Sequence, residues 1–108
     1  MMTNRIELFR EALKSDPENE LAHFSLANEL LEQELFSEAL GHYEKCLLIR
    51  PSWMRVFIQV GRCCYELGDL ERAVDVLNQA KAAILQSNDH ENLDEVNDLL
   101  SRCEEEGD

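Results

Sequence analysis

Residues 57–77 read FIQVGRCCYELGDLERAVDVL, and residues 23–43 read HFSLANELLEQELFSEALGHY. The two stretches align at a spacing of 34 residues, which also separates Ala39 from Ala73. A fixed period of this size indicates stacked helix pairs, because each pair can bury its apolar face only against its neighbours. The repeat therefore predicts an all-α fold with a binding role, for which no catalytic group is required.

Each stretch combines a bulky first residue, a large–small pair, and an alanine placed four positions before another large side chain. The residues in this pattern are His23, Leu26, Ala27, Leu30, Ala39, Tyr43 and Pro51 in the first stretch, and Phe57, Val60, Gly61, Cys64, Ala73 and Leu77 in the second. The pattern resembles the tetratricopeptide repeat, and the matches extend over about residues 4 to 86. The resemblance implies a right-handed superhelical stack of antiparallel helix pairs, with about six helices in all.

Departures from the repeat define the ends of a single predicted domain, 1–108. The first segment aligns only with the second helix of a repeat, and Arg5 stands in the column of Ala39 and Ala73. After the second repeat, Asn88 and Glu91 have capping-box spacing and predict the start of a further helix. The segments are a half repeat at 4–16, a first repeat at 20–53, a second repeat at 54–86, a capping helix at 88–104 and an acidic tail at 105–108.

Three single residues carry more local predictions. Gly68 stands in the turn between the paired helices of the second repeat, whereas Glu34 takes that place in the first repeat. A turn without glycine is expected to be more strained. Trp53 precedes the first helix of the second repeat, and we expect its ring to pack on Phe57 and to anchor that helix start. An exposed anchor for a binding partner is the alternative role of this tryptophan.

The formal net charge of −13 excludes several partner classes. A chain without a basic face is not expected to bind nucleic acid or an anionic membrane surface. Asn4, Arg5 and Glu7 interrupt any apolar run near the start, so no signal peptide is expected. No apolar stretch approaches the ~20 residues of a membrane span. We therefore expect a cytoplasmic location.

The four cysteines do not have metal-ligand spacing. Cys46 and Cys64 fall in core columns of the repeat, and the adjacent Cys63 points about 100° away from Cys64 around a helix. Buried reduced thiols are the expected state. The three histidines are scattered, and no nucleophile–base pair or phosphate loop is present. No metal, cofactor or enzymatic activity is therefore expected.

The resemblance implies that the first helix of each repeat lines a concave groove. The groove residues implied for this chain are Phe24, Asn28, Arg55, Ile58, Gln59, Arg62 and Tyr65. Arg55 and Arg62 lie seven residues apart on one helix face, so both can reach an acidic group of a bound peptide or partner helix. The carboxylate clamp of chaperone-binding members is matched only in part, because Phe24 and Gln59 replace a lysine and an asparagine.

Three other interpretations stay open. Both arginines could pair with Glu66, Glu29 or another local carboxylate and only solvate the groove. A homodimer could form through the unpaired helix of the half repeat, near Ile6 and Phe9. An enzyme is the third possibility and has the least support.

Overall fold

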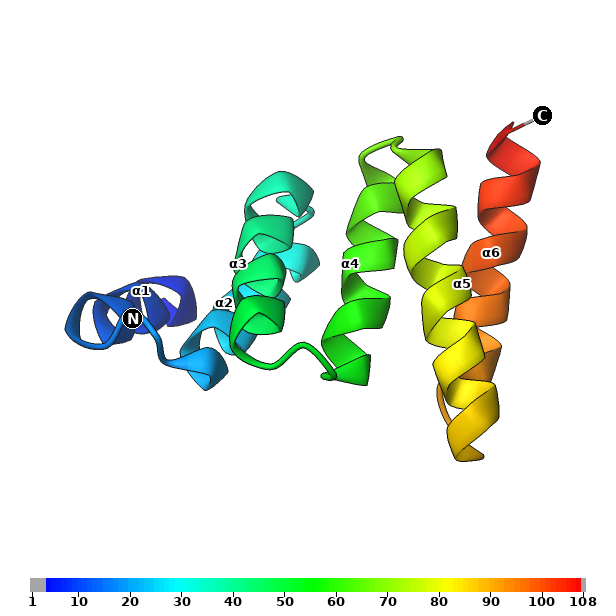
Figure 1. Ribbon diagram of the computed structural model, residues 1–108. Coiled ribbons are helices and arrows are strands. Elements are labelled where there is room, and N and C mark those ends of the chain that lie inside the picture. The colour runs from blue at the N-terminus through cyan, green and yellow to red at the C-terminus, as the bar shows by residue number, and fades with distance from the viewer. Residues whose placement is uncertain (1–3, 108) are drawn as a thin grey trace. The chain divides into compact units, whose positions relative to one another are not determined.

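The computed structural model describes residues 4–107, and all regular secondary structure in this range is helical (Figure 1). The helices are α1 (Arg5–Ser15), α2 (Glu20–Glu32), α3 (Phe36–Ile49), α4 (Met54–Glu66), α5 (Leu70–Ser87) and α6 (Leu93–Gly107). The expected all-α fold of about six helices is thereby confirmed. The chain divides into an N-terminal unit, up to Trp53, and a C-terminal unit, from Met54 onward.

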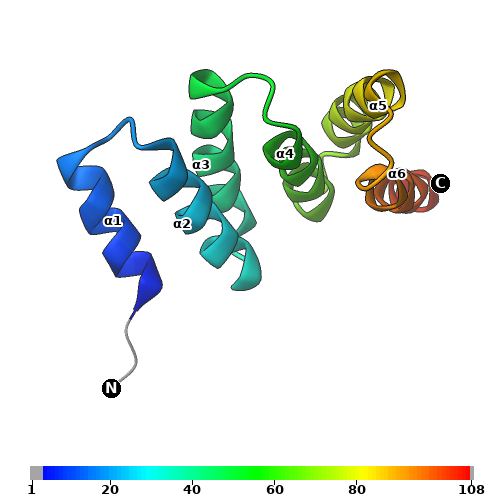
Figure 2. The ribbon, with the colours of Figure 1, turned by 90° about the horizontal axis from the view of Figure 1, so that it is seen from below.

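In the N-terminal unit, α2 packs against both α1 and α3 (Figure 2). The side chains of Leu26, Leu30 and Tyr43 are at most 1% exposed and form its core. Burying each large apolar side chain contributes about 1.5–3 kcal/mol to folding. Ala39 is completely buried, as the repeat register requires, whereas the Arg5 side chain is 72% exposed and pairs with Glu29.

In the C-terminal unit, α4, α5 and α6 all pack against one another (Figures 1 and 2). Its fully buried large side chains include Ile58, Leu77, Ile84 and Val96. Ala73 is also completely buried. The side of α4 that faces α6 therefore belongs to the interior of this unit, at least in part.

The turns after α2 and α4 have the same hydrogen-bond pattern. The amide of Leu35 donates to the carbonyl of Leu30, and the amide of Asp69 donates to the carbonyl of Cys64. In both turns the hydrogen bond closes a loop of six residues, counting the donor and the acceptor. This pattern is typical of a helix that ends in a residue of left-handed conformation, for which glycine is preferred. Gly68 has φ of 83° and Glu34 has φ of 61°. The strain expected at the turn without glycine therefore lies at Glu34.

The boundary between α5 and α6 differs from the prediction. Asn88 does not cap the start of α6 but ends α5, with φ of 59° in the left-handed region. Asn tolerates this conformation because its short polar side chain can bond locally, which makes it a common helix terminator. The capping helix begins at Leu93 rather than at residue 88, and it continues through residues 105–107 of the predicted acidic tail. Asp108 lies outside the described residues.

Candidate functional site

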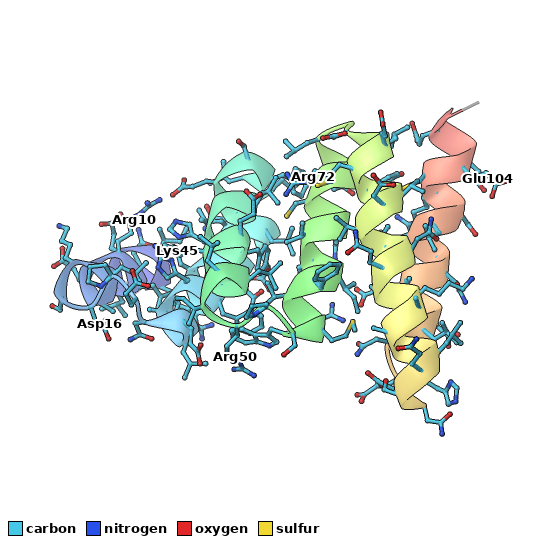
Figure 3. All side chains as sticks on the ribbon, viewed as in Figure 1. Arg10, Asp16, Lys45, Arg50, Arg72 and Glu104 are labelled. Atoms are coloured by element: carbon cyan, nitrogen blue, oxygen red, sulfur yellow. The ribbon has the colours of Figure 1, made fainter. Side chains whose placement is uncertain are left out.

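The predicted groove residues fall on α2 in the N-terminal unit and on α4 in the C-terminal unit. In the N-terminal unit, the ring of Phe24 stacks on Trp53 at 4.7 Å between centroids and meets Tyr43 edge-on at 6.4 Å. Arg50, which is labelled in Figure 3, follows the last residue of α3. Its guanidinium lies 4.3 Å from the centre of the Trp53 ring. The prediction that Trp53 packs on Phe57 is wrong: its ring stacks with Phe24, from α2. Trp53 is therefore held by two contacts, aromatic stacking on Phe24 and a cation–π contact with Arg50.

Asn28 follows Phe24 by one turn of α2. Its Oδ1 accepts a hydrogen bond of 2.5 Å from the hydroxyl of Tyr43. This contact fixes the orientation of the amide, because Tyr43 is completely buried and its hydroxyl needs an acceptor. The amide nitrogen of Asn28 is the part that can donate to a ligand.

Arg55 links α4 to α6 in the C-terminal unit. Its two terminal nitrogens donate to the carboxylate of Glu95 at 2.5 and 2.9 Å, and one also donates to Asn92 at 3.2 Å. The hydrogen bond from Arg55 lowers the pKa of Glu95, although burial acts in the opposite direction. Arg55 thus forms an ion pair within the chain, which was one of the alternatives left open by the sequence. Its partner, Glu95 on α6, was not predicted.

Arg62 lies two turns after Arg55 and is exposed. Among residues 4–107 it forms no ion pair, so the alternative in which Arg62 pairs with Glu66 is not present there. It faces a surface pocket of about 140 Å³ between α4 and α6. The other residues that line this pocket, which we call the Arg62 pocket, are Glu66, Glu95, Asp98, Leu99 and Arg102.

The expected exposure of two groove residues is wrong. Ile58 is 0% exposed and Gln59 is 8% exposed. Both lie within about one turn of Arg55 and Arg62, so they are next to the side of α4 that α6 covers. The prediction failed because it assumed an uncovered face on α4. The Oε1 atom of Gln59 is buried and has no hydrogen-bond partner in the part of the chain that the structure describes.

Tyr65 is half-buried and belongs to a second, larger pocket of about 400 Å³. Glu66, Gly68, Leu70 and Glu106 complete the lining of this pocket, which we call the Tyr65 pocket. Burial raises the pKa of the Tyr65 hydroxyl, and the negative charge of Glu106 acts in the same direction. Tyr65 therefore lies at the surface of the C-terminal unit, and its predicted place in a binding groove stays a prediction.

The thiols are buried and reduced. Burial raises the pKa of Cys46 to about 11 and that of Cys63 to about 12. Thiolates are the reactive form, so neither group is activated for chemistry. Within residues 4–107, no group of three His, Cys, Asp or Glu side chains is placed to hold a metal ion. None of the helices in that range is both long and apolar enough to cross a bilayer.

Two features were missed by sequence reasoning. Asn92, in the turn before α6, and Glu95, on α6, hold Arg55, and the sequence contains no signal for a pair 40 residues apart. His23 and His42 meet with their Nδ1 atoms 3.0 Å apart. Their common placement on facing helices of one repeat could have suggested this contact, because both lie in the paired helices of residues 20–53.

Comparisons with known proteins concern the family and the fold of this chain. Residues 55–84 match the family model described as tetratricopeptide repeat. The chain is 29% identical over 75 residues to anaphase-promoting complex subunit 3 of Dictyostelium discoideum, a match that covers 69% of this chain and 8% of that protein. It is 30% identical over 73 residues to tetratricopeptide repeat-containing protein trd-1 of Caenorhabditis elegans, with coverage of 67% and 10%. The matches thus span a tenth or less of the length of these two relatives.

Solved structures share the fold. Protein BPP2914 from Bordetella parapertussis superimposes with a TM-score of 0.83 at 25% identity, over 97% of this chain and 91% of that one. The TPR2B domain of yeast Sti1, solved as a complex with pHsp70, has a TM-score of 0.82 at 19% identity, over 94% and 81%. The helical repeat and these matches identify the chain as a member of the tetratricopeptide repeat family.

Proposed function

We propose that this chain is a protein-interaction module that binds an extended peptide or a partner helix, and that Arg62 holds an acidic group of that partner. The observation that carries the proposal is the state of Arg62: it is exposed, faces the Arg62 pocket and has no ion pair within residues 4–107. An exposed guanidinium keeps its donors for a carboxylate, which it can bind through two hydrogen bonds.

Arg55 has a different role in this proposal. Its guanidinium already binds the carboxylate of Glu95, so it positions α6 rather than the partner. Arg102 on α6 also faces the Arg62 pocket, but its Nε pairs with Asp98 at 3.1 Å. Arg62 is therefore the cation of this surface that a partner can take up without displacing an existing pair.

The N-terminal unit offers an apolar contact for the same kind of partner. Leu21 is 63% exposed and lies on α2 one turn before Phe24. The ring of Phe24 is held in place by Trp53 and Tyr43, so little conformational entropy is lost when a ligand packs on it. The TPR2B domain of yeast Sti1, which has the same fold, was solved as a complex with pHsp70.

The test begins with a partner recovered by affinity purification and reduced to its binding segment. We expect Arg62→Ala to weaken binding of that segment by about 1.5–3 kcal/mol, the value of a hydrogen bond to a charged group. Lys81→Ala removes one positive charge from α5, outside the Arg62 pocket, and serves as the control. Equal affinity of Arg62→Ala and the wild type would remove Arg62 from the site.

A homodimer through α1 is the alternative, and Leu8 is the observation that favours it. Leu8 is 55% exposed on this first helix. Ile6, which the sequence places at the open side, is 9% exposed and contributes to the core of its own unit. Sedimentation at increasing concentration separates the two functions, since a monomer at high micromolar concentration excludes the dimer.

A further inference from the structure

The Tyr65 pocket differs from the Arg62 pocket in that no basic side chain lines it, although Glu66 lines both pockets. It combines one aromatic ring with two carboxylates, contributed by Tyr65 and Glu66 on α4 and by Glu106 on α6. Its volume of about 400 Å³ falls within the range of roughly 300–1,000 Å³ of small-molecule sites. A side chain can therefore enter it without rearrangement of the backbone.

The two carboxylates of this pocket have no internal counter-ion. Neither Glu66 nor Glu106 forms an ion pair within the described range, 4–107. Arg102 lies one turn before Glu106 on α6, but its Nε is paired with Asp98. The pocket therefore keeps a local excess of negative charge, and Glu104 and Glu105 add to it at the same end of α6.

A cation is the ligand that such a lining recognises. The face of an aromatic ring attracts an ammonium or a guanidinium, and carboxylates within reach add direct ion pairing. The methylene stem of lysine or arginine can also pack on apolar surface such as that of Leu70. We propose that the Tyr65 pocket binds the side chain of a lysine or an arginine on a partner protein.

This inference deepens the proposed function, because it assumes a protein partner and gives it a second charged contact. The two pockets share Glu66, and Arg62 precedes this residue by one turn of α4, which is about 6 Å along the helix axis. In an extended segment, side chains two residues apart point the same way and are separated by about 7 Å. The partner segment would therefore carry an acidic residue and a basic residue at positions i and i+2.

The test uses a defined probe, the peptide acetyl-Gly-Lys-Gly-amide, titrated into the full chain and followed by NMR of the tyrosine rings. We expect the Tyr65 resonances to shift, and those of the completely buried Tyr43 to stay unchanged. The same peptide with an acetylated lysine side chain has no charge and should leave both rings unchanged. Unshifted Tyr65 resonances, or equal shifts with the neutral peptide, would overturn the proposal.

Matched variants identify the carboxylate. Glu106→Gln should weaken binding of the lysine peptide about two- to fivefold, the effect of one exposed ion pair. Glu104→Gln changes the net charge equally, two residues away on the same helix and outside the pocket lining. An equal loss in both variants would indicate diffuse charge attraction and exclude the site.

Two further variants complete the design. Tyr65→Leu should weaken the lysine peptide about two- to fivefold through loss of the cation–aromatic contact. Because Tyr65 is half-buried, the thermal melting of the Tyr65→Leu variant is measured as well. If Tyr65→Leu does not fold, Glu106→Gln still tests the pocket. Arg62→Ala should not weaken the lysine peptide, so failure at one pocket can be distinguished from failure at the other.

Discussion

Gly61 on α4 and Leu77 on α5 approach so closely that there is no room for a single added methyl group. A Cβ atom on Gly61 would lie 2.6 Å from Cδ2 and 2.7 Å from Cγ of Leu77, whose side chain is completely buried. In the first repeat, Ala27 takes the place of Gly61 and Tyr43 that of Leu77. The large–small pairing of the repeat is therefore a steric match between two helices, and its details differ from one repeat to the next.

Gly61→Ala should destabilise the chain by about 1–3 kcal/mol, because Leu77 has to leave its packed position. Chemical denaturation measures the change. Gly41→Ala is the matched control, since a Cβ atom there meets nothing within 4 Å. Alanine is favoured over glycine in a helix, so this control should gain about 0.5–1 kcal/mol. A neutral Gly61→Ala variant would show that the helices can separate without cost.

Glu34→Gly should stabilise the turn between α2 and α3. A non-glycine residue in the left-handed region costs about 1–2 kcal/mol, and the greater flexibility of glycine when unfolded offsets about half of this. We expect a net gain of about 0.5–1 kcal/mol. Gly68→Glu makes the reverse change at φ of 83° and should lose stability. The idea fails if the two substitutions change the denaturation midpoint in the same direction.

Ala39→Leu should lower stability by about 1–3 kcal/mol through overpacking, because Ala39 is completely buried between paired helices. Arg5→Leu is the control in the same repeat column. Arg5 is 72% exposed and its single ion pair with Glu29 is solvated, so its loss should have little effect. Thermal melting of both variants tests the register, and an unchanged melting temperature for Ala39→Leu would contradict it.

His42 should make folding sensitive to mild acid. His23 donates from Nε2 to the carbonyl of Pro17 at 2.8 Å, so its neutral Nδ1 accepts from Nδ1 of His42. Burial lowers the pKa of His42 below 6.5, the neighbouring His23 ring acts in the same direction, and Glu38 opposes the shift. The unfolded chain then binds protons more readily, so stability is fully present above pH 6.5 and falls as the pH drops through the folded pKa.

The measurement compares the free energy of unfolding at about pH 7.5 and about pH 5.5 for the wild type and for His42→Gln. The variant lacks the titrating group and should lose less stability between the two conditions. The pKa of Glu38 is lowered mainly by its hydrogen bond with Arg10, so Glu38 makes stability depend on pH only near and below pH 4.5. It therefore does not affect the comparison between about pH 7.5 and about pH 5.5. An identical pH dependence in both proteins would contradict the assignment.

Arg55→Ala should destabilise the C-terminal unit, whereas Arg62→Ala should not. Both partners of the Arg55–Glu95 pair are about one-third exposed, so solvent reduces its value and we expect a loss of about 0.5–1 kcal/mol. A double-mutant cycle with Glu95→Gln isolates the pair. The pKa of Glu95 is lowered from 4.5, so the coupling should be present above pH 4.5 and disappear in stronger acid. Additive single losses would show that the pair contributes nothing.

Single residues show how far sequence reasoning reaches. Ala39 and Ala73 were predicted to be buried because a period of 34 residues specifies which side chains meet between paired helices. The side chain of Asp69 accepts from the amide of Arg72 and caps the start of α5, a role for which aspartate is among the preferred residue types. Asn88 was misassigned because the same residue type serves at the start and at the end of a helix, and only the backbone conformation distinguishes the two.

The helical period and the size of the side chain at each repeat position are local properties that recur along the chain. The sequence by itself therefore determined the six-helix architecture and the core columns around Ala39 and Leu77. The pairing of Arg55 with Glu95, the burial of Ile58 and the contact of His23 with His42 were decided by tertiary structure alone. Each depends on which side of a helix a distant segment covers. That choice follows from the packing of whole surfaces, and no local pattern of residues records it.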